Sequence, residues 1–348
     1  MQPGLHIDYE AIAANWRLLA DRVKPARCAG VVKDNAYGLG LRRVAEALAA
    51  AGCNDFFVAH LHEGVQLRTL LPKARIFLLN GVTSDKVAED MVTARLMAIL
   101  NHEDDLAYWR ALGQRLNRKL PCWLHVDTGM NRLGWNAQTL DPELEGVEVQ
   151  GLMSHLACSD EAQHPLNELQ LARFTQLRDR FPAMEASFAN SGGIFLGPDY
   201  HFNLVRPGIA LYGGHPLNTG PNPMQPVVSL YAPVLQVREV PAGQSVGYGA
   251  SFITARPSRL ATLDAGYAQG LLRTLSNKGV VAFNGVRAPI VGRVSMDLTV
   301  VDVTDVPYAV QPGQAAELIG PTLTLEEQAQ AAGTISYEIL TRINWPRA

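Results

Sequence analysis

A lysine ends a short apolar run near the start of the chain. The run is RCAGVVK, which closes at Lys33, and the turn-forming residues of DNAYGLG follow at once. A lysine in this place is commonly a solvated charge at the rim of a sheet. In surroundings of low dielectric constant, however, a lysine can lose its proton and act as a nucleophile or a base. Lys33 is therefore a candidate catalytic residue whose role depends on its neighbours.

Other polar side chains follow later apolar runs in the same manner. His155 closes GLMSH, Asn190 and Ser191 close SFANS, Arg206 follows FNLV, and Arg132 comes shortly after PCWLHVD. Taken singly, these residues fit a buried structural histidine, an ordinary strand-to-helix turn and charges at a rim. In a barrel of parallel strands, functional side chains gather at the carboxyl ends of the strands. Their shared position favours one common site.

Short apolar runs alternate with amphipathic helical stretches between about residues 27 and 213. The eight runs are RCAGVVK, DFFVA, RIFLLN, LMAIL, PCWLHVD, EVQGLMSH, EASFAN and GIALYG. Eight strands, most of them followed by a helix, predict an α/β fold built as a closed (β/α)8 TIM barrel. A doubly wound open sheet would produce a similar alternation, so the pattern alone leaves that alternative open.

The composition of the sequence changes after the last of these runs. GGHPLNTGPNPMQP is rich in Pro, Gly and Asn and is typical of a linker. Beyond Val227, β-rich segments dominate, and Asn284-Gly285 between two apolar runs predicts a hairpin. We therefore predict two domains, a barrel over residues 1–224 and a smaller, mostly β domain over residues 225–348.

The composition is that of an ordinary globular protein of 348 residues, 47% of them apolar. The 30 basic and 33 acidic residues give a formal net charge of −3 without long runs, which argues against nucleic acid or a membrane as partner. The polar residues His6, Asp8 and Glu10 make the amino-terminal segment unlike a signal peptide. The four cysteines have wide, irregular spacings, so we expect free thiols and a cytoplasmic location.

Two loops of small residues are suited to hold a phosphate. NSGG follows the seventh run and RPGIALYG forms the eighth, and this is where barrels commonly bind phosphate with backbone N–H groups, helix N-termini and a hydroxyl. A lysine at the same mouth suggests a cofactor that carries both an aldehyde and a phosphate. Pyridoxal 5'-phosphate has both groups and joins lysine as a Schiff base. We expect the barrel domain to bind it.

A set of motifs also carries a family resemblance. In chain order they are VVKDNAYGLG, HVDTGMNRLG, GLMSHLA, ANSGG, VRPGIALYG, VGYGASF, AGYAQG, GRVSMD and SYEIL. Together they resemble alanine racemase, a pyridoxal-phosphate enzyme with a barrel and a β domain. The resemblance extends from about residue 5 to about residue 342. It implies an isomerase that interconverts L-alanine and D-alanine.

The resemblance also implies a mechanism with two bases. Lys33 would hold the cofactor and serve the D-isomer, while Tyr248 from the partner subunit would serve the L-isomer from the opposite face. One acid/base on each side of a planar carbanion is what inversion requires. His155 and Arg206 would form a network that tunes Tyr248, and Arg206 would face the pyridine nitrogen and leave it neutral because a guanidinium stays protonated.

The remaining site residues are assigned by resemblance alone. The cofactor phosphate would be bound by Tyr37, Asn190, Ser191, Gly208, Ile209 and Tyr337. Arg132 would meet the phenolic oxygen of the cofactor or the substrate carboxylate. The substrate would also meet the backbone of Met296 from the partner subunit, and Tyr267, which with Tyr337 narrows the entrance. The implied assembly is a homodimer with shared sites, and no residue is assigned to a metal.

The chain departs from the family pattern at a few positions. His125 stands seven residues before Arg132, where many members carry a carbamylated lysine whose negative charge holds the arginine. Histidine cannot supply that charge, so we expect a bound anion or a neighbouring carboxylate to hold Arg132. Asp34, Leu39 and Gln269 also differ from the commoner residues, and the last two bear on substrate preference.

Three alternatives remain at this point. A non-catalytic pyridoxal-phosphate carrier would lack the β domain and Tyr248. A decarboxylase of basic amino acids would need a cysteine in the C-terminal domain, whereas the last cysteine is Cys158. A racemase for serine, for lysine or for a broad range of amino acids is compatible with the motifs. The motifs do not distinguish between two physiological roles, the supply of D-alanine for the cell wall and the degradation of D-alanine.

Overall fold

The computed structural model describes residues 2–137, 140 and 145–345. The chain divides into two compact units, residues 9–225 and residues 1–8 together with 226–348. The first unit carries Lys33, His155 and Arg206, and the second carries Tyr248. Binding of the cofactor by the first unit stays a prediction.

The first unit is a barrel of parallel strands. Strands β3, β4, β5, β6, β7, β9 and β10 are hydrogen-bonded neighbours in this order, and β11 pairs with β2. The ring closes because β2 and β3 are two halves of one strand and because the N–H of Ala29 bonds to the carbonyl of Val205 at 2.9 Å. The bounds are β2 Arg27–Cys28, β3 Gly30–Val31, β4 Asp55–Val58, β5 Arg75–Leu78, β6 Met97–Leu100, β7 Leu120–Asp127, β9 Val147–Met153, β10 Glu185–Ser187 and β11 Leu204–Val205.

The predicted barrel is confirmed, but its eighth strand was placed wrongly. The run GIALYG forms the short 3-10 helix η2 (Ile209–Tyr212), and the strand that closes the ring is β11. All four residues of η2 are buried, and a short buried apolar run has the same sequence pattern in a helix as in a strand. The N–H groups of Gly208 and Ala210 bond to the side chain of Ser191 rather than to a neighbouring strand.

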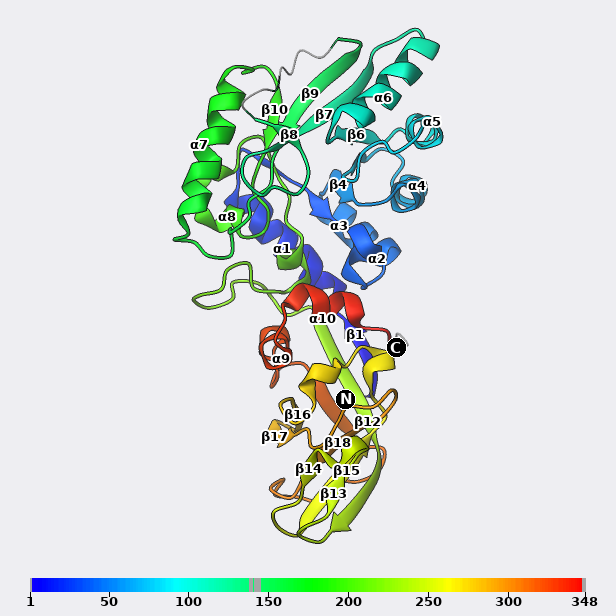
Figure 1. Cartoon of the computed structure of the whole chain (residues 1–348), viewed down its shortest axis with the longest axis vertical. Coiled ribbons are helices and arrows are strands. Elements are labelled where there is room, and N and C mark those ends of the chain that lie inside the picture. The colour runs from blue at the N-terminus through cyan, green and yellow to red at the C-terminus, as the bar shows by residue number, and fades with distance from the viewer. Residues whose placement is uncertain (1, 138–139, 141–144, 346–348) are drawn as a thin grey trace. The chain divides into compact units, whose positions relative to one another are not determined.

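Helices cover the outside of this barrel, as Figure 1 shows for α4, α5 and α6 beside the strands β4 to β7. In α3 the buried residues Leu41, Val44 and Leu48 share one face, and Gly52 ends the helix in the left-handed conformation that glycine adopts without strain. The bounds are α1 Tyr9–Arg22, α2 Lys33–Tyr37, α3 Leu41–Ala51, α4 Leu61–Leu70, α5 Asp85–Thr93, α6 Glu103–Arg115, α7 Pro165–Asp179 and α8 Gly193–Leu196. None of the helices in the described residues combines the length and apolar character that a bilayer-spanning segment needs.

Aromatic side chains fill the barrel. Phe57 stacks on Phe77 with ring centroids 4.4 Å apart, and Trp123 meets Phe77 edge-on at 5.2 Å. Gly151 on β9 faces Trp123, where any Cβ would collide with the indole ring. The interior is therefore a packed core, and polar groups concentrate at the strand ends.

The second unit is built on a twisted antiparallel sheet. Its order is β17-β16-β19-β12-β15-β18, and β1 also pairs with β12. The predicted hairpin is confirmed, since Asn284 and Gly285 join β16 to β17 with φ of 46° and 83°. The pairing of residues 4–7 with β12 could not be predicted from the sequence, because a short apolar segment contains no information about which strand it will pair with. The bounds are β1 Gly4–Ile7, β12 Val228–Val240, β15 Ser258–Leu263, β16 Val280–Phe283, β17 Val286–Pro289, β18 Thr299–Asp302, β19 Ala315–Ile319, α9 Leu325–Ala332 and α10 Ser336–Arg342.

An ion-pair cluster joins the amino ends of the barrel strands. Asp55 at the start of β4 is only 5% exposed and accepts hydrogen bonds from Arg27 on β2 at 3.1 Å and Arg75 on β5 at 2.6 Å. Glu185 on β10 binds the same two arginines at 2.6 and 3.2 Å. The cluster thus links four strand positions at the end of the barrel opposite to the polar loops.

Replacing Asp55→Ala should lower the free energy of unfolding by about 1 to 3 kcal/mol, because two guanidinium groups lose a buried partner while water still screens them partly. Urea unfolding followed by circular dichroism measures this. The matched control is Asp90→Ala, which removes an exposed helical pair with Lys86 and should cost under about 0.5 kcal/mol. Equal losses in both variants would show that the cluster does not stabilise the barrel.

Candidate active site

A buried arginine occupies the centre of the carboxyl end of the barrel. Arg206 follows β11 directly and is 4% exposed. Its guanidinium donates to the Ser187 hydroxyl at 2.6 Å, to the carbonyls of Ser154 at 2.6 Å and Phe188 at 3.3 Å, and to Nδ1 of His155 at 3.3 Å. Burial lowers the pKa of Arg206 to about 9, so the group is still a cation at neutral pH. Every one of these partners is neutral.

Arg206 decides the tautomer of His155. A guanidinium only donates hydrogen bonds, so Nδ1 of His155 accepts and the proton of the neutral ring sits on Nε2. Burial, followed by the charges of Arg206 and Arg132, holds the pKa of His155 well below its ordinary value. Gln170 fixes the backbone at this point by donating to the His155 carbonyl at 2.9 Å. His155 is therefore a neutral ring that can donate a hydrogen bond through Nε2.

His125 has the opposite tautomer. Its Nδ1 lies 2.8 Å from Oδ1 of Asn101, and the amide nitrogen of Asn101 donates to the carbonyl of Leu79 at 3.1 Å. That second bond fixes the orientation of the amide, so Nδ1 of His125 carries the proton and Nε2 is the acceptor. Burial and the charges of Arg206 and Arg132 lower the pKa of His125 to about 4. A neutral acceptor thus stands where the resemblance led us to expect a negative charge.

Arg132 lies on an exposed loop after β7. Asp127 organises this loop, because its carboxylate accepts from the N–H groups of Gly129, Met130 and Asn131 at 2.9 to 3.2 Å. The sequence had left a bound anion or a neighbouring carboxylate as the means of holding Arg132. Asp127 supplies a carboxylate that holds the backbone of the loop.

Hydroxyl and backbone N–H groups converge on a second corner of the same barrel end. The Ser191 hydroxyl, 3% exposed, accepts from the N–H of Gly208 at 2.9 Å and from that of Ala210 at 3.3 Å, so its own proton is free to bind another acceptor. A Cβ at Gly208 would collide with the hydroxyl of Tyr37, which places that hydroxyl beside the loop. Asn190 supports the turn by accepting from the N–H of Gly193 at 3.0 Å. The Ser191 hydroxyl, with the Tyr37 hydroxyl beside the same loop, fits the phosphate of pyridoxal phosphate.

Lys33 enters this region from a strained turn. The four residues after it, Asp34 to Tyr37, all have φ of 54° or 55°, although none is glycine. A left-handed conformation costs such residues about 1 kcal/mol each. The Tyr37 ring packs against that of Tyr212 at 4.7 Å, and the Tyr212 hydroxyl donates to the carbonyl of Val31 at 2.8 Å. Lys33 is also close enough to His155 for its charge to lower the pKa of that ring.

The other predicted residues belong to the second unit, where they are exposed. Tyr248 is 73% exposed between Gly247 and Gly249, which have φ of 69° and 70°. Met296 is 56% and Tyr267 44% exposed, and their two loops are joined by N–H···O bonds of 2.9 and 3.0 Å. Tyr337 on α10 is 41% exposed.

Comparison with known proteins identifies the family. The family model "Alanine racemase, N-terminal domain" matches residues 7–216, and the model "Alanine racemase, C-terminal domain" matches residues 227–347. The chain belongs to the alanine racemase family. Its members are isomerases, so the resemblance drawn from the motifs is confirmed.

Individual family members agree over nearly the whole chain. An alanine racemase of Rhodospirillum rubrum is 46% identical, with 99% of this chain and 94% of the relative covered. A catabolic alanine racemase of Agrobacterium fabrum is 48% identical, with 97% and 89% covered. A solved alanine racemase from Bartonella henselae with covalently bound pyridoxal phosphate superposes with a TM-score of 0.94 at 46% identity, with 99% and 97% covered.

Several residues that hold the candidate site were not found from the sequence. Ser187, Asn101 and Gln170 are polar residues inside apolar or helical segments, and their contacts span 19 to 42 positions of the chain. Glu63 was missed as well, although it stands at the third position of α4, where a carboxylate commonly caps a helix. No local pattern connects these residues to Lys33 or Arg206.

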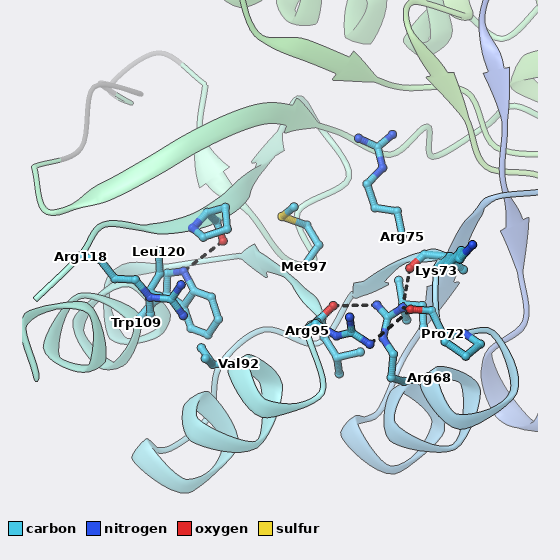
Figure 2. Close-up of a pocket in the computed structure, with 14 residues that line it drawn as sticks. Arg68, Pro72, Lys73, Arg75, Val92, Arg95, Met97, Trp109, Arg118 and Leu120 are labelled. Carbon is cyan, nitrogen blue, oxygen red and sulfur yellow. Dashed lines mark hydrogen bonds between the residues drawn. The ribbon is translucent and has the colours of Figure 1, made fainter. Parts of the chain in front are cut away.

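Figure 2 shows a cavity of about 570 Å³ at the opposite end of the barrel, beside the first residues of β5, β6 and β7. Two of the cations that line it, Arg68 and Arg75, stabilise the fold. Arg75 is bound by Asp55 and Glu185. Arg68 donates to the backbone carbonyls of Leu71, Pro72, Ala74, Ala94 and Arg95. The cavity is therefore separate from the strand ends that carry the candidate catalytic groups.

His125 should make stability depend on pH. The unfolded chain protonates this histidine near pH 6.5, whereas the folded chain does so near pH 4, so the unfolded state binds more protons between these values. The free energy of unfolding should fall as pH falls, by about 2 kcal/mol from His125 between pH 7 and pH 5. Urea unfolding at both values should show a decrease smaller by that amount in His125→Gln. The same decrease in both proteins would contradict the neutral state of His125.

Proposed function

We propose that this chain interconverts L-alanine and D-alanine with pyridoxal 5'-phosphate as its cofactor. The observation that carries the proposal is the convergence of Lys33, a neutral His155, a buried Arg206 and the donors around Ser191 at one end of one barrel. The covalently bound cofactor of the Bartonella henselae relative supports it. When bound, pyridoxal phosphate withdraws electrons from the α-carbon and so makes its proton acidic.

The barrel residues would hold the cofactor. Lys33 would supply the amine for covalent attachment, and Arg206 would face the pyridine nitrogen as a donor that keeps its proton. The phosphate would be bound by Tyr37, Asn190, Ser191, Gly208 and Ile209 of the barrel and by Tyr337 of the second unit. Arg132, the Met296 backbone and Tyr267 would orient the substrate carboxylate and narrow the entrance.

Two side chains would move the α-proton, one on each face. Lys33 takes it from D-alanine, and Tyr248 of a second copy takes it from L-alanine. The exposure of Tyr248, Met296 and Tyr267 supports a homodimer, because large exposed side chains held together on one unit commonly face a partner. In that arrangement Nε2–H of His155 donates to the phenolic oxygen of Tyr248 and stabilises its deprotonated form.

A cytoplasmic location also remains a prediction. Cys28, Cys53 and Cys122 are buried free thiols, which is the usual state of cysteine in a reducing compartment.

Chiral analysis in heavy water tests the proposed function. Purified protein with pyridoxal phosphate is incubated separately with L-alanine, L-serine and L-lysine. We expect D-alanine to form fastest, with deuterium at the α-carbon. Faster D-serine or D-lysine would favour the broader or alternative racemase. Deuterium without inversion would remove Tyr248 as the second base, and no exchange would favour the carrier.

Mixed variants test the shared site. Lys33→Ala and Tyr248→Phe should each lose about a thousandfold in turnover, since each removes one acid/base. In a heterodimer of the two, one site of the pair regains both native residues. Refolding equal amounts together should restore roughly a quarter of the native activity, because about half of the dimers are mixed. If no activity returns while gel filtration shows mixed dimers, Lys33 and Tyr248 do not act across subunits.

A further inference from the structure

The turn after Lys33 is held by a residue from another part of the barrel. Glu63 on α4 is 4% exposed, and its Oε1 accepts the backbone N–H of Asn35 at 3.1 Å. Its Oε2 accepts the N–H groups of Ala59 and His60, each at 3.1 Å. One carboxylate therefore joins the end of β4 and the start of α4 to the middle of the left-handed turn 34–37.

This turn sets the distance between two side chains that are predicted to bind the cofactor. Lys33 precedes its four left-handed residues, and Tyr37 is the last of them. The Tyr37 hydroxyl lies beside Gly208, in the corner where the Ser191 hydroxyl points. A turn that relaxed to right-handed conformations would separate the lysine from the tyrosine hydroxyl.

Several other backbone bonds hold the turn, and they are local: the N–H groups of Ala36, Gly38 and Leu39 bond to the carbonyls of Val32, Asp34 and Ala36 at 2.9 to 3.0 Å. Asn35 contributes a carbonyl that accepts from Gly40 at 2.8 Å and a side-chain oxygen that accepts from Leu41 at 2.8 Å. Both of these bonds are local, within the segment that follows Lys33. Glu63 supplies the bond to Asn35 from a separate strand-helix junction.

We propose that Glu63 is a positioning residue, whose carboxylate holds the left-handed turn 34–37 and thereby sets Lys33 and Tyr37 for the cofactor. This inference rests on the proposed function. It also explains why a carboxylate is needed. Both oxygens of Glu63 accept N–H groups, whereas an amide has only one accepting oxygen and would turn an NH₂ group toward an N–H donor on one side.

Glu63→Gln tests the inference with little change in volume. The amide oxygen can still serve the two N–H groups at α4, so the lost bond is the one to Asn35. We expect pyridoxal phosphate to bind about tenfold more weakly in equilibrium dialysis. After borohydride reduction, mass spectrometry should find a smaller fraction of Lys33 carrying the cofactor at a fixed concentration.

Glu317→Gln is the matched control in the second unit. Glu317 is 6% exposed and also accepts backbone N–H groups, from Thr322 at 2.6 Å and Leu323 at 2.8 Å. Its replacement should leave cofactor affinity at the native value, because Glu317 lies outside the unit that carries Lys33. Native cofactor affinity in Glu63→Gln, with only a lowered midpoint, would overturn the positioning role.

Asp34 supplies a rescue and a second test. Its side chain is exposed and its φ is 54°, so Asp34→Gly favours the left-handed backbone without altering the core. Added to Glu63→Gln, it should recover about threefold or more in cofactor affinity. Asp34→Val disfavours the turn with Glu63 intact and should weaken binding even if Glu63→Gln does not fold. Native affinity in Asp34→Val would overturn the inference.

The cofactor readouts need no amino acid. If native protein attaches pyridoxal phosphate to Lys33 but racemises nothing, the proposed function fails while the Glu63 inference stands on affinity alone. If native protein racemises alanine and Glu63→Gln binds the cofactor normally, the proposed function stands and the Glu63 inference fails.

Discussion

The buried guanidinium of Arg206 is the interaction on which the rest of the candidate site depends. A cation enclosed among neutral partners keeps its charge only because it donates to the Ser187 hydroxyl, to two backbone carbonyls and to His155. These bonds in turn orient the Ser187 hydroxyl on β10, hold the backbone at the end of β9 and select the tautomer of His155. Its charge also helps to keep His155 and His125 neutral. Arg206 thus adds to the effect of burial, which is the main reason that both rings stay neutral.

The barrel separates stability from chemistry by using its two ends differently. At the amino ends, Asp55 and Glu185 neutralise Arg27 and Arg75, and Arg68 donates to backbone carbonyls such as that of Ala74. At the carboxyl ends, charges such as Arg206 and Arg132 face neutral rings. Such an arrangement favours a bound anion, which the phosphate of the cofactor and the carboxylate of an amino acid both supply. The aromatic core between the ends keeps the two sets of charges apart.

Strain is concentrated where the cofactor lysine leaves its strand. Four consecutive left-handed residues without a glycine persist only when surrounding bonds determine them. Glu63 does this at Asn35, in the middle of the turn, and the Tyr37–Tyr212 contact does it at the last residue. The result is a short, rigid connection from Lys33 to a phosphate-binding hydroxyl. A regular helix at this position would direct Tyr37 elsewhere.

The sequence by itself determined the alternation of strands and helices, the Asn284-Gly285 hairpin, the family and the positions of Lys33, His155 and Arg206 at strand ends. These features are local or periodic, so a single chain displays them. Only the tertiary structure decided that β11 rather than GIALYG closes the barrel, that His125 and His155 have opposite tautomers, and that Glu63 holds the turn after Lys33. Each of these depends on a hydrogen bond between groups far apart in the chain. The periodicity of apolar residues indicates that a residue is buried, but it does not indicate which group that residue will contact.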